Sequence, residues 1–78
     1  MNYEIILDLC LNLKDANDIK AFHEEMDIFG LSWSIHNAVG PAGGWPEIKL
    51  VGTHNCIMDY LLANEMDDEI FTDSIKEA

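Results

Sequence analysis

The clearest alternation of apolar and polar side chains lies at the start of the chain. Between Tyr3 and Leu13 every odd-numbered residue is large and apolar, whereas the even-numbered residues are mostly polar. A pleated strand places alternate side chains on opposite faces, whereas a helix would scatter them around its circumference. We therefore predict a half-buried strand over residues 3–13. Because it is the most apolar strand, we expect it to be central in its sheet.

A helical repeat follows this strand. Asp15 is a suitable N-cap, Asp18 would complete a weak capping box, and Gly30 can close the helix in a left-handed conformation. The expected buried stripe consists of Ile19, Phe22, Met26 and Phe29. The opposite face is expected to point away from the core, with Asp18, Lys20, Glu24, Glu25 and Asp27.

Two shorter alternating stretches predict strands at residues 31–36 and 47–51. In the first of these, Leu31, Trp33 and Ile35 would face the core; in the second, Ile48 and Leu50 would. Residues 37–46 are dense in turn formers and predict a mobile loop. Gly52 and Thr53 would start a second helix that stops near Asn64, with a buried face of Cys56, Ile57, Tyr60, Leu61 and Asn64.

The last stretch, from Glu65 to Ala78, has two interpretations. Ile70, Phe71 and Ile75 have spacing compatible with a short helix capped by Asp67 or Asp68. Residues 69–75 fit a fourth strand beside the first equally well. We therefore predict a single α+β domain over residues 1–66, followed by an acidic C-terminal segment, strand or short helix, over residues 67–78.

The order strand, helix, strand, strand, helix, with this optional last strand, predicts a two-layer ferredoxin-like sandwich. Its antiparallel sheet would be covered by two helices on one face, and the other face would be open. The open face would display Glu4, Ile6, Asp8, Cys10, Asn12, Ser32, Ser34, His36, Glu47, Lys49 and Val51. Such a face suits solvent or a second copy of the chain.

The charge balance narrows the choice of partners. The 78 residues carry 15 acidic side chains, four lysines and no arginine, for a formal charge of −11. Binding to nucleic acid or to an anionic membrane normally uses clusters of lysine and arginine, so we expect neither. The acid is concentrated in residues 15–30 and 65–78, which suggests a surface for a basic protein; a merely solubilising surface is the alternative.

Neither an export signal nor a membrane-spanning apolar run is evident in the sequence, so we expect a cytoplasmic protein with reduced cysteines. The three histidines and two cysteines lack the spacing of metal ligands. Cys56 would begin the second helix, but His54 is badly placed to act as its base. We expect no enzymatic activity, no metal and no cofactor.

The segment from Trp45 to Thr53 is a short strand that ends in Gly-Thr before a helix and follows a glycine-rich loop. This arrangement resembles the second half of small ferredoxin-like accessory proteins encoded by bacteriophages, over about a third of the chain. The resemblance implies a protein that modifies host machinery by binding it, in the cytoplasm of the infected cell. It assigns no functional residues.

These observations predict a non-enzymatic acidic interaction module, of the type of a phage inhibitor, that binds a basic surface of a host or defence protein. Trp45 could anchor the partner, although we favour its folding back onto the core. The candidate partner-binding residues are Asp18, Glu24, Glu25, Asp27, Trp45, Asp67, Asp68 and Glu69. The alternative function is a small structural or regulatory homo-oligomer, such as a homodimer, that associates through the open sheet face.

Overall fold

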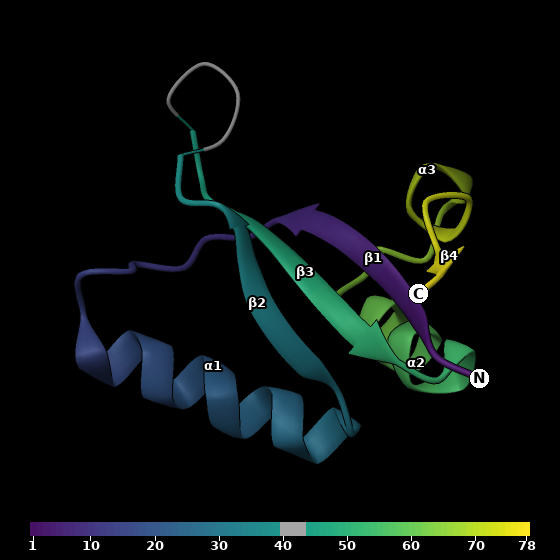
Figure 1. Cartoon of the computed structure of the whole chain (residues 1–78), viewed down its shortest axis with the longest axis horizontal. Helices are drawn as coiled ribbons and strands as arrows, with labels where there is room; N and C mark the ends of the chain where they lie inside the picture. The colour runs from purple at the N-terminus through teal and green to yellow at the C-terminus, as the bar shows by residue number, and fades with distance from the viewer. Residues whose placement is uncertain (40–43) are drawn as a thin grey trace.

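The computed structural model describes residues 1–39 and 44–78 and contains strands and helices in a mixed order along the chain (Figure 1). The predicted loop therefore lies partly outside the described residues. In chain order the elements are β1 (Tyr3–Asp8), α1 (Ala16–Phe29), β2 (Ser32–Asn37), β3 (Glu47–Gly52), α2 (His54–Ala63), α3 (Glu69–Thr72) and β4 (Lys76–Glu77).

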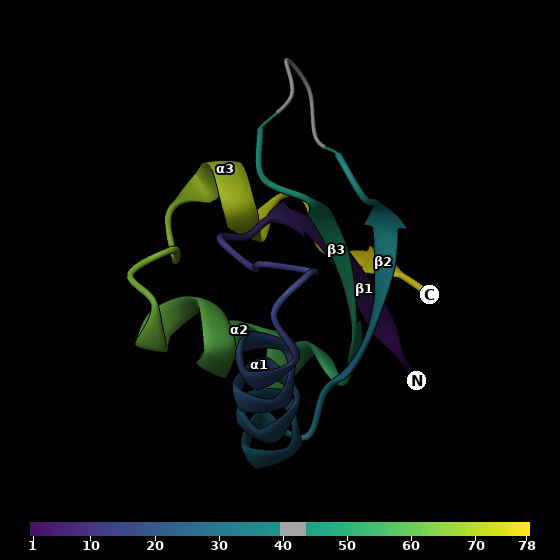
Figure 2. The same cartoon turned by 90° about the vertical axis from the view of Figure 1, so that its left-hand side faces the viewer.

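The strands form one antiparallel sheet in the order β2-β3-β1-β4. Figure 2 shows the helices on one side of this sheet, while the opposite side is open. This is the predicted ferredoxin-like sandwich, in which β3 is inserted between β1 and β2. The strand registers place Glu4, Ile6, Glu47, Lys49 and Val51 together on the open face, as predicted.

The central strand of the sheet is β3. The first strand, β1, was predicted to be central, but it has a strand on both sides only at its first residues. β3 pairs with β1 from Glu47 to Gly52 and with β2 on its other side, and Ile48 and Leu50 are fully buried. β4 pairs only with Tyr3 and Glu4. The rest of β1 therefore lies at an edge of the sheet.

β1 ends at Asp8, so the prediction of a strand through residue 13 is wrong. The Leu9 N–H donates to the Pro46 carbonyl at 3.2 Å, but proline has no N–H to return a bond. The Leu9 carbonyl instead accepts from the Leu11 N–H at 2.8 Å, which turns the chain. Leu11 still reaches the core and is buried.

The ends of α1 and α2 follow from their capping residues. The Asp15 carboxylate accepts from the Asn17 N–H at 2.9 Å, and Gly30 ends α1 with a φ of 70°. The Thr53 hydroxyl accepts from the Cys56 N–H at 3.1 Å and starts α2. The predicted boundaries of both helices are thereby confirmed to within two residues.

The core between the sheet and the helices consists of Ile5, Leu7, Leu11, Phe22, Met26, Leu31, Ile48, Leu50, Ile57, Tyr60 and Leu61. Two predicted core positions are corrected. Ile35 is 49% exposed, because β2 and α1 diverge from their junction at Gly30 (Figure 1). Asn64 is exposed at the end of α2, where its side-chain amide donates to the Tyr60 carbonyl at 2.8 Å.

The C-terminal segment forms the predicted short helix, whereas residues 69–75 do not form the alternative strand. α3 begins after Asp68, and the strand β4 follows at Lys76–Glu77, beside β1 but later than predicted. The Ala78 N–H donates to the Asn2 carbonyl at 3.0 Å. Both ends of the described chain therefore lie at the same edge of the sheet.

Candidate functional site

The two acidic segments lie on different sides of the molecule. α1 covers the sheet near β2, whereas α3 lies beyond β1, and the views of Figures 1 and 2 agree on this separation. The carboxylates at the start of the tail, Asp67, Asp68 and Glu69, are all exposed. The structure therefore does not join the two groups of predicted binding residues into one surface.

Two of the four predicted acidic residues of α1 do not point freely away from the core, as had been expected. Asp18 is half-buried, and its carboxylate accepts from the Asn12 N–H at 2.7 Å rather than completing a capping box with Asp15. Glu25 is also half-buried. Each lies about one turn from Phe22, on the border of the buried stripe.

The charge of Glu25 affects the pKa of Tyr60, a buried residue of α2. Burial, together with the negative charge of Glu25, raises the pKa of Tyr60 from 10.0 to about 12. The Glu25 carboxylate is therefore close enough to α2 for its charge to act on the Tyr60 hydroxyl.

Glu24 and Asp27 are the freely exposed predicted carboxylates of α1. They are three residues apart and so are neighbours on the helix surface, and Ile28 beside them is 83% exposed. The Asp27 carboxylate lies 3.8 Å from Nε2 of His23, whose Nδ1 accepts from the Trp33 indole N–H at 3.1 Å. We call Glu24, Asp27 and Ile28 the α1 face.

A second surface feature is a hollow between β1 and α3, which we call the β1 groove. It encloses about 500 Å³, a volume within the range of ligand-binding clefts. Its lining is mainly apolar with an acidic rim, and consists of Ile6, Leu7, Asp8, Trp45, Glu47, Met66, Ile70, Phe71 and Ser74. The sequence was compatible with the tail as a strand beside the first strand, but it did not predict a groove between β1 and a short helix.

Trp45 lies at the β1 groove and is 59% exposed. The favoured interpretation, in which this indole folds back onto the core, is therefore wrong. Trp45 lies two residues before the start of β3, outside the sheet. Its large apolar surface is available for contact with another molecule.

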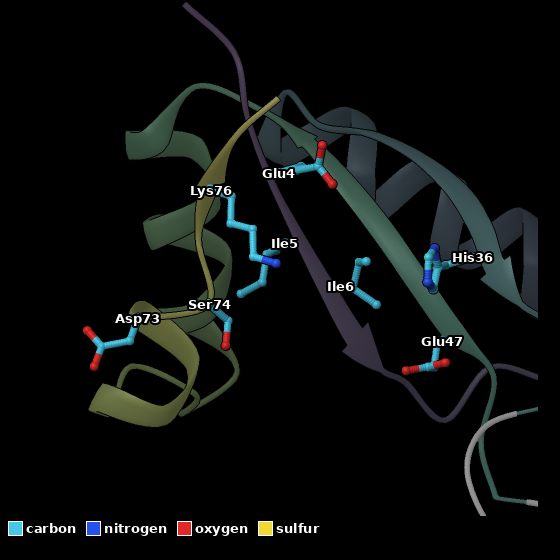
Figure 3. Close-up of a pocket in the computed structure, with 8 residues that line it drawn as sticks. All are labelled: Glu4, Ile5, Ile6, His36, Glu47, Asp73, Ser74 and Lys76. Atoms are coloured by element: carbon cyan, nitrogen blue, oxygen red, sulfur yellow. The ribbon is translucent and has the colours of Figure 1, made fainter.

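The β1 groove continues onto the open face of the sheet as a second hollow of about 410 Å³, shown in Figure 3. Ile6, Glu47 and Ser74 line both hollows. In Figure 3 the tail supplies Asp73, Ser74 and Lys76 on one side, and the sheet supplies Glu4, Ile6, His36 and Glu47 on the other. The Lys49 ammonium lies 3.8 Å from the Glu4 carboxylate at this face.

Within residues 1–39 and 44–78, no three His, Cys, Asp or Glu side chains are grouped so that they could hold a metal ion. Cys10 is an exposed thiol and Cys56 is a half-buried one. In the same described ranges, no helix is both long enough and apolar enough to cross a membrane.

Comparisons with protein-family models, with curated proteins and with solved structures found no match to this chain.

Proposed function

We propose that this protein is a non-enzymatic interaction module whose acidic surface binds a basic, nucleic-acid-binding surface of a partner protein. The observation that carries the proposal is the exposed α1 face in a chain with a formal charge of −11 and no arginine. The resemblance to phage accessory proteins supports a host or defence protein as the partner, and an inhibitor as the functional type. Cytoplasmic action belongs to the same proposal.

The proposed mechanism is electrostatic mimicry of a nucleic acid. Glu24 and Asp27 on α1, and Asp67, Asp68 and Glu69 on the tail, would occupy positions that phosphates take on the partner. Charge of this density accelerates association and makes affinity fall with ionic strength, because the Debye length shrinks from about 14 Å at 50 mM to about 4 Å at 500 mM salt. Asp18 and Glu25 would contribute less, because both are half-buried.

The first test is capture of partners from bacterial lysate by the tagged protein at about 50 mM and about 500 mM salt. We expect one stoichiometric partner that is lost at the higher salt concentration. Its affinity for a Glu24→Lys, Asp27→Lys variant should then fall at least tenfold, which corresponds to about 1.4 kcal/mol.

The matched control is an Asp59→Lys, Glu65→Lys variant, which changes the net charge by the same amount at exposed positions outside the proposed binding residues. Equal losses for the two variants would show that only total charge matters and that α1 is not the binding face. A partner whose binding is independent of salt would contradict the electrostatic mechanism itself.

A second candidate function is a homo-oligomer that associates through the open sheet face. It is favoured by the half-buried apolar side chains Ile6 and Val51 on that face, since sheets can stack face to face at about 10 Å. Light scattering across a concentration series tests it. A monomer at every concentration would eliminate this candidate, and a dimer that a Val51→Lys substitution dissociates would support it.

A further inference from the structure

The outer edge of β1 has backbone groups that pair with no strand among the described residues. The Leu9 N–H, on the inner edge, donates to the carbonyl of Pro46, which immediately precedes β3. Because consecutive residues of a strand direct their N–H and C=O groups to opposite edges, Ile6 and Asp8 direct theirs away from β3. β4 pairs only with Tyr3 and Glu4, so no described strand lies beside Ile6 and Asp8.

This edge opens onto the β1 groove rather than onto a flat surface. On the helix side of the sheet, Leu7 meets the apolar side chains Met66, Ile70 and Phe71 across the groove. Ile70 is 77% exposed there. The groove therefore offers an apolar site beside unpaired backbone donors and acceptors, the combination by which a sheet edge takes up an extended peptide.

The open face beside the same edge has a different character. Asp8 and Glu47 face each other in the β1–β3 ladder and line the groove, and Glu4 lies further along the same face. A strand added at this edge would place alternate side chains on the two faces. One set would enter the apolar groove, and the other would lie beside these carboxylates.

We propose that the β1 edge binds an extended peptide segment of a partner protein by strand addition, and that this segment alternates apolar and basic residues. The apolar residues occupy the β1 groove between Leu7 and α3, and the basic residues lie beside Asp8 and Glu47. The segment runs antiparallel to β1, as β3 and β4 do. This surface is separate from the α1 face, so the inference does not depend on electrostatic mimicry by α1.

The geometry of antiparallel pairing determines which backbone N–H groups of the peptide donate hydrogen bonds to β1. In an antiparallel pair, a residue directly opposite Asp8 exchanges hydrogen bonds with it and shares its side of the sheet. The basic residues of the peptide therefore donate their N–H groups to β1. The N–H groups of the apolar residues point away from the protein.

The test uses a fluorescently labelled seven-residue peptide in which lysine and valine alternate, with lysine at both ends, and measures its binding by fluorescence anisotropy. We expect saturable binding. Methylation of the lysine backbone nitrogens should weaken binding at least tenfold, because it removes the N–H groups that face β1. Methylation of the valine backbone nitrogens leaves the charge of the peptide unchanged and should leave its affinity unchanged. It serves as the matched control.

Substitutions in the protein, at the β1 edge and in the β1 groove, test the same strand pairing. Asp8→Pro removes an N–H that faces outward and leaves the ladder with β3 intact, so it should weaken binding at least tenfold. Asp8→Ala keeps that N–H and loses only the carboxylate, and should weaken binding by a few-fold. Ile70→Asp, at an exposed position, should also weaken binding, whereas Asp59→Lys, at an exposed position of α2, should not.

Three results would overturn the proposal. The first is the absence of binding at peptide concentrations of about 1 mM. The second is equal binding of the two methylated peptides, or loss of binding by the valine-methylated peptide alone. The third is a dimer in light scattering that Asp8→Pro dissociates, since a second copy of the chain would then occupy the β1 edge.

Discussion

The packing of α1 against α2 changes the pKa of a single side chain, Tyr60. Only 3% of it is exposed, and its ring meets that of Phe29 edge to face at a centroid distance of 5.4 Å. Its hydroxyl must stay protonated, because burial and the charge of Glu25 both disfavour the phenolate. The pKa of Tyr60 is therefore raised to about 12, against 10.0 for an unperturbed tyrosine.

This shift predicts a loss of stability at alkaline pH. Between pH 10 and 12, the unfolded chain releases the Tyr60 proton while the folded protein retains it. The stabilisation present below pH 10 therefore falls as pH rises, by roughly 2 kcal/mol across this window. Urea unfolding of wild type and Tyr60→Phe from pH 8 to pH 11.5 measures it, and the variant should lose less stability. A Tyr3→Phe control should behave as wild type; parallel curves for all three proteins would contradict the assignment.

At the scale of elements, the connection between β1 and α1 depends on one carboxylate. Asp18, in the first turn of α1, holds the Asn12 N–H at 2.7 Å, and the Asn12 side chain in turn accepts from the Lys14 N–H at 3.0 Å. These bonds fix the turn that brings the chain from the sheet to the helix layer. Asp18 therefore has a structural role, although its sequence position resembles that of a surface acid.

We expect Asp18→Ala to lower the free energy of unfolding by about 1 kcal/mol, because it leaves a backbone donor without its charged acceptor. Glu24→Ala removes the same charge from an exposed position of the same helix, and should change stability by less than about 0.5 kcal/mol. Chemical denaturation of both variants provides the comparison. A smaller loss for Asp18→Ala than for Glu24→Ala would show that the Asn12 contact does not stabilise the fold.

The elements that could be predicted are those whose signals are local. Periodicity and capping residues placed α1, α2, β2 and β3 within a few residues, because Asp15, Gly30 and Thr53 act on their own helices. The end of β1 is different, since it is decided by Pro46, which immediately precedes β3 and is distant from β1 in the sequence. The tail and the β1 groove also depend on contacts with distant residues, which a single sequence pattern does not encode.

For the whole molecule, the excess of negative charge opposes compaction. Within the described residues the Lys49 ammonium pairs with the Glu4 carboxylate at 3.8 Å, and the His23 imidazole lies 3.8 Å from the Asp27 carboxylate. Neither is buried, so each stabilises the fold only weakly. The remaining carboxylates repel one another across a small surface.

Added salt should therefore stabilise this protein. We expect the midpoint of thermal unfolding to rise by several degrees between about 20 mM and about 300 mM sodium chloride, because screening weakens the repulsion. A Glu24→Gln, Asp27→Asn variant should show a smaller rise, since two of the repelling charges are gone. A midpoint that does not change with sodium chloride would mean that the carboxylates are too far apart to interact.

The hydrogen bond between Ala78 and Asn2 also determines how the molecule responds to mechanical force. Tension applied between these two residues pulls on the end of the β1–β4 ladder, so its hydrogen bonds are loaded one after another, as in a zipper. A ladder loaded in this way opens at low force. The tail would detach first, while the longer ladder between β1 and β3 remains closed. A pull on the two ends would thus extend the exposed edge of β1 before the core unfolds.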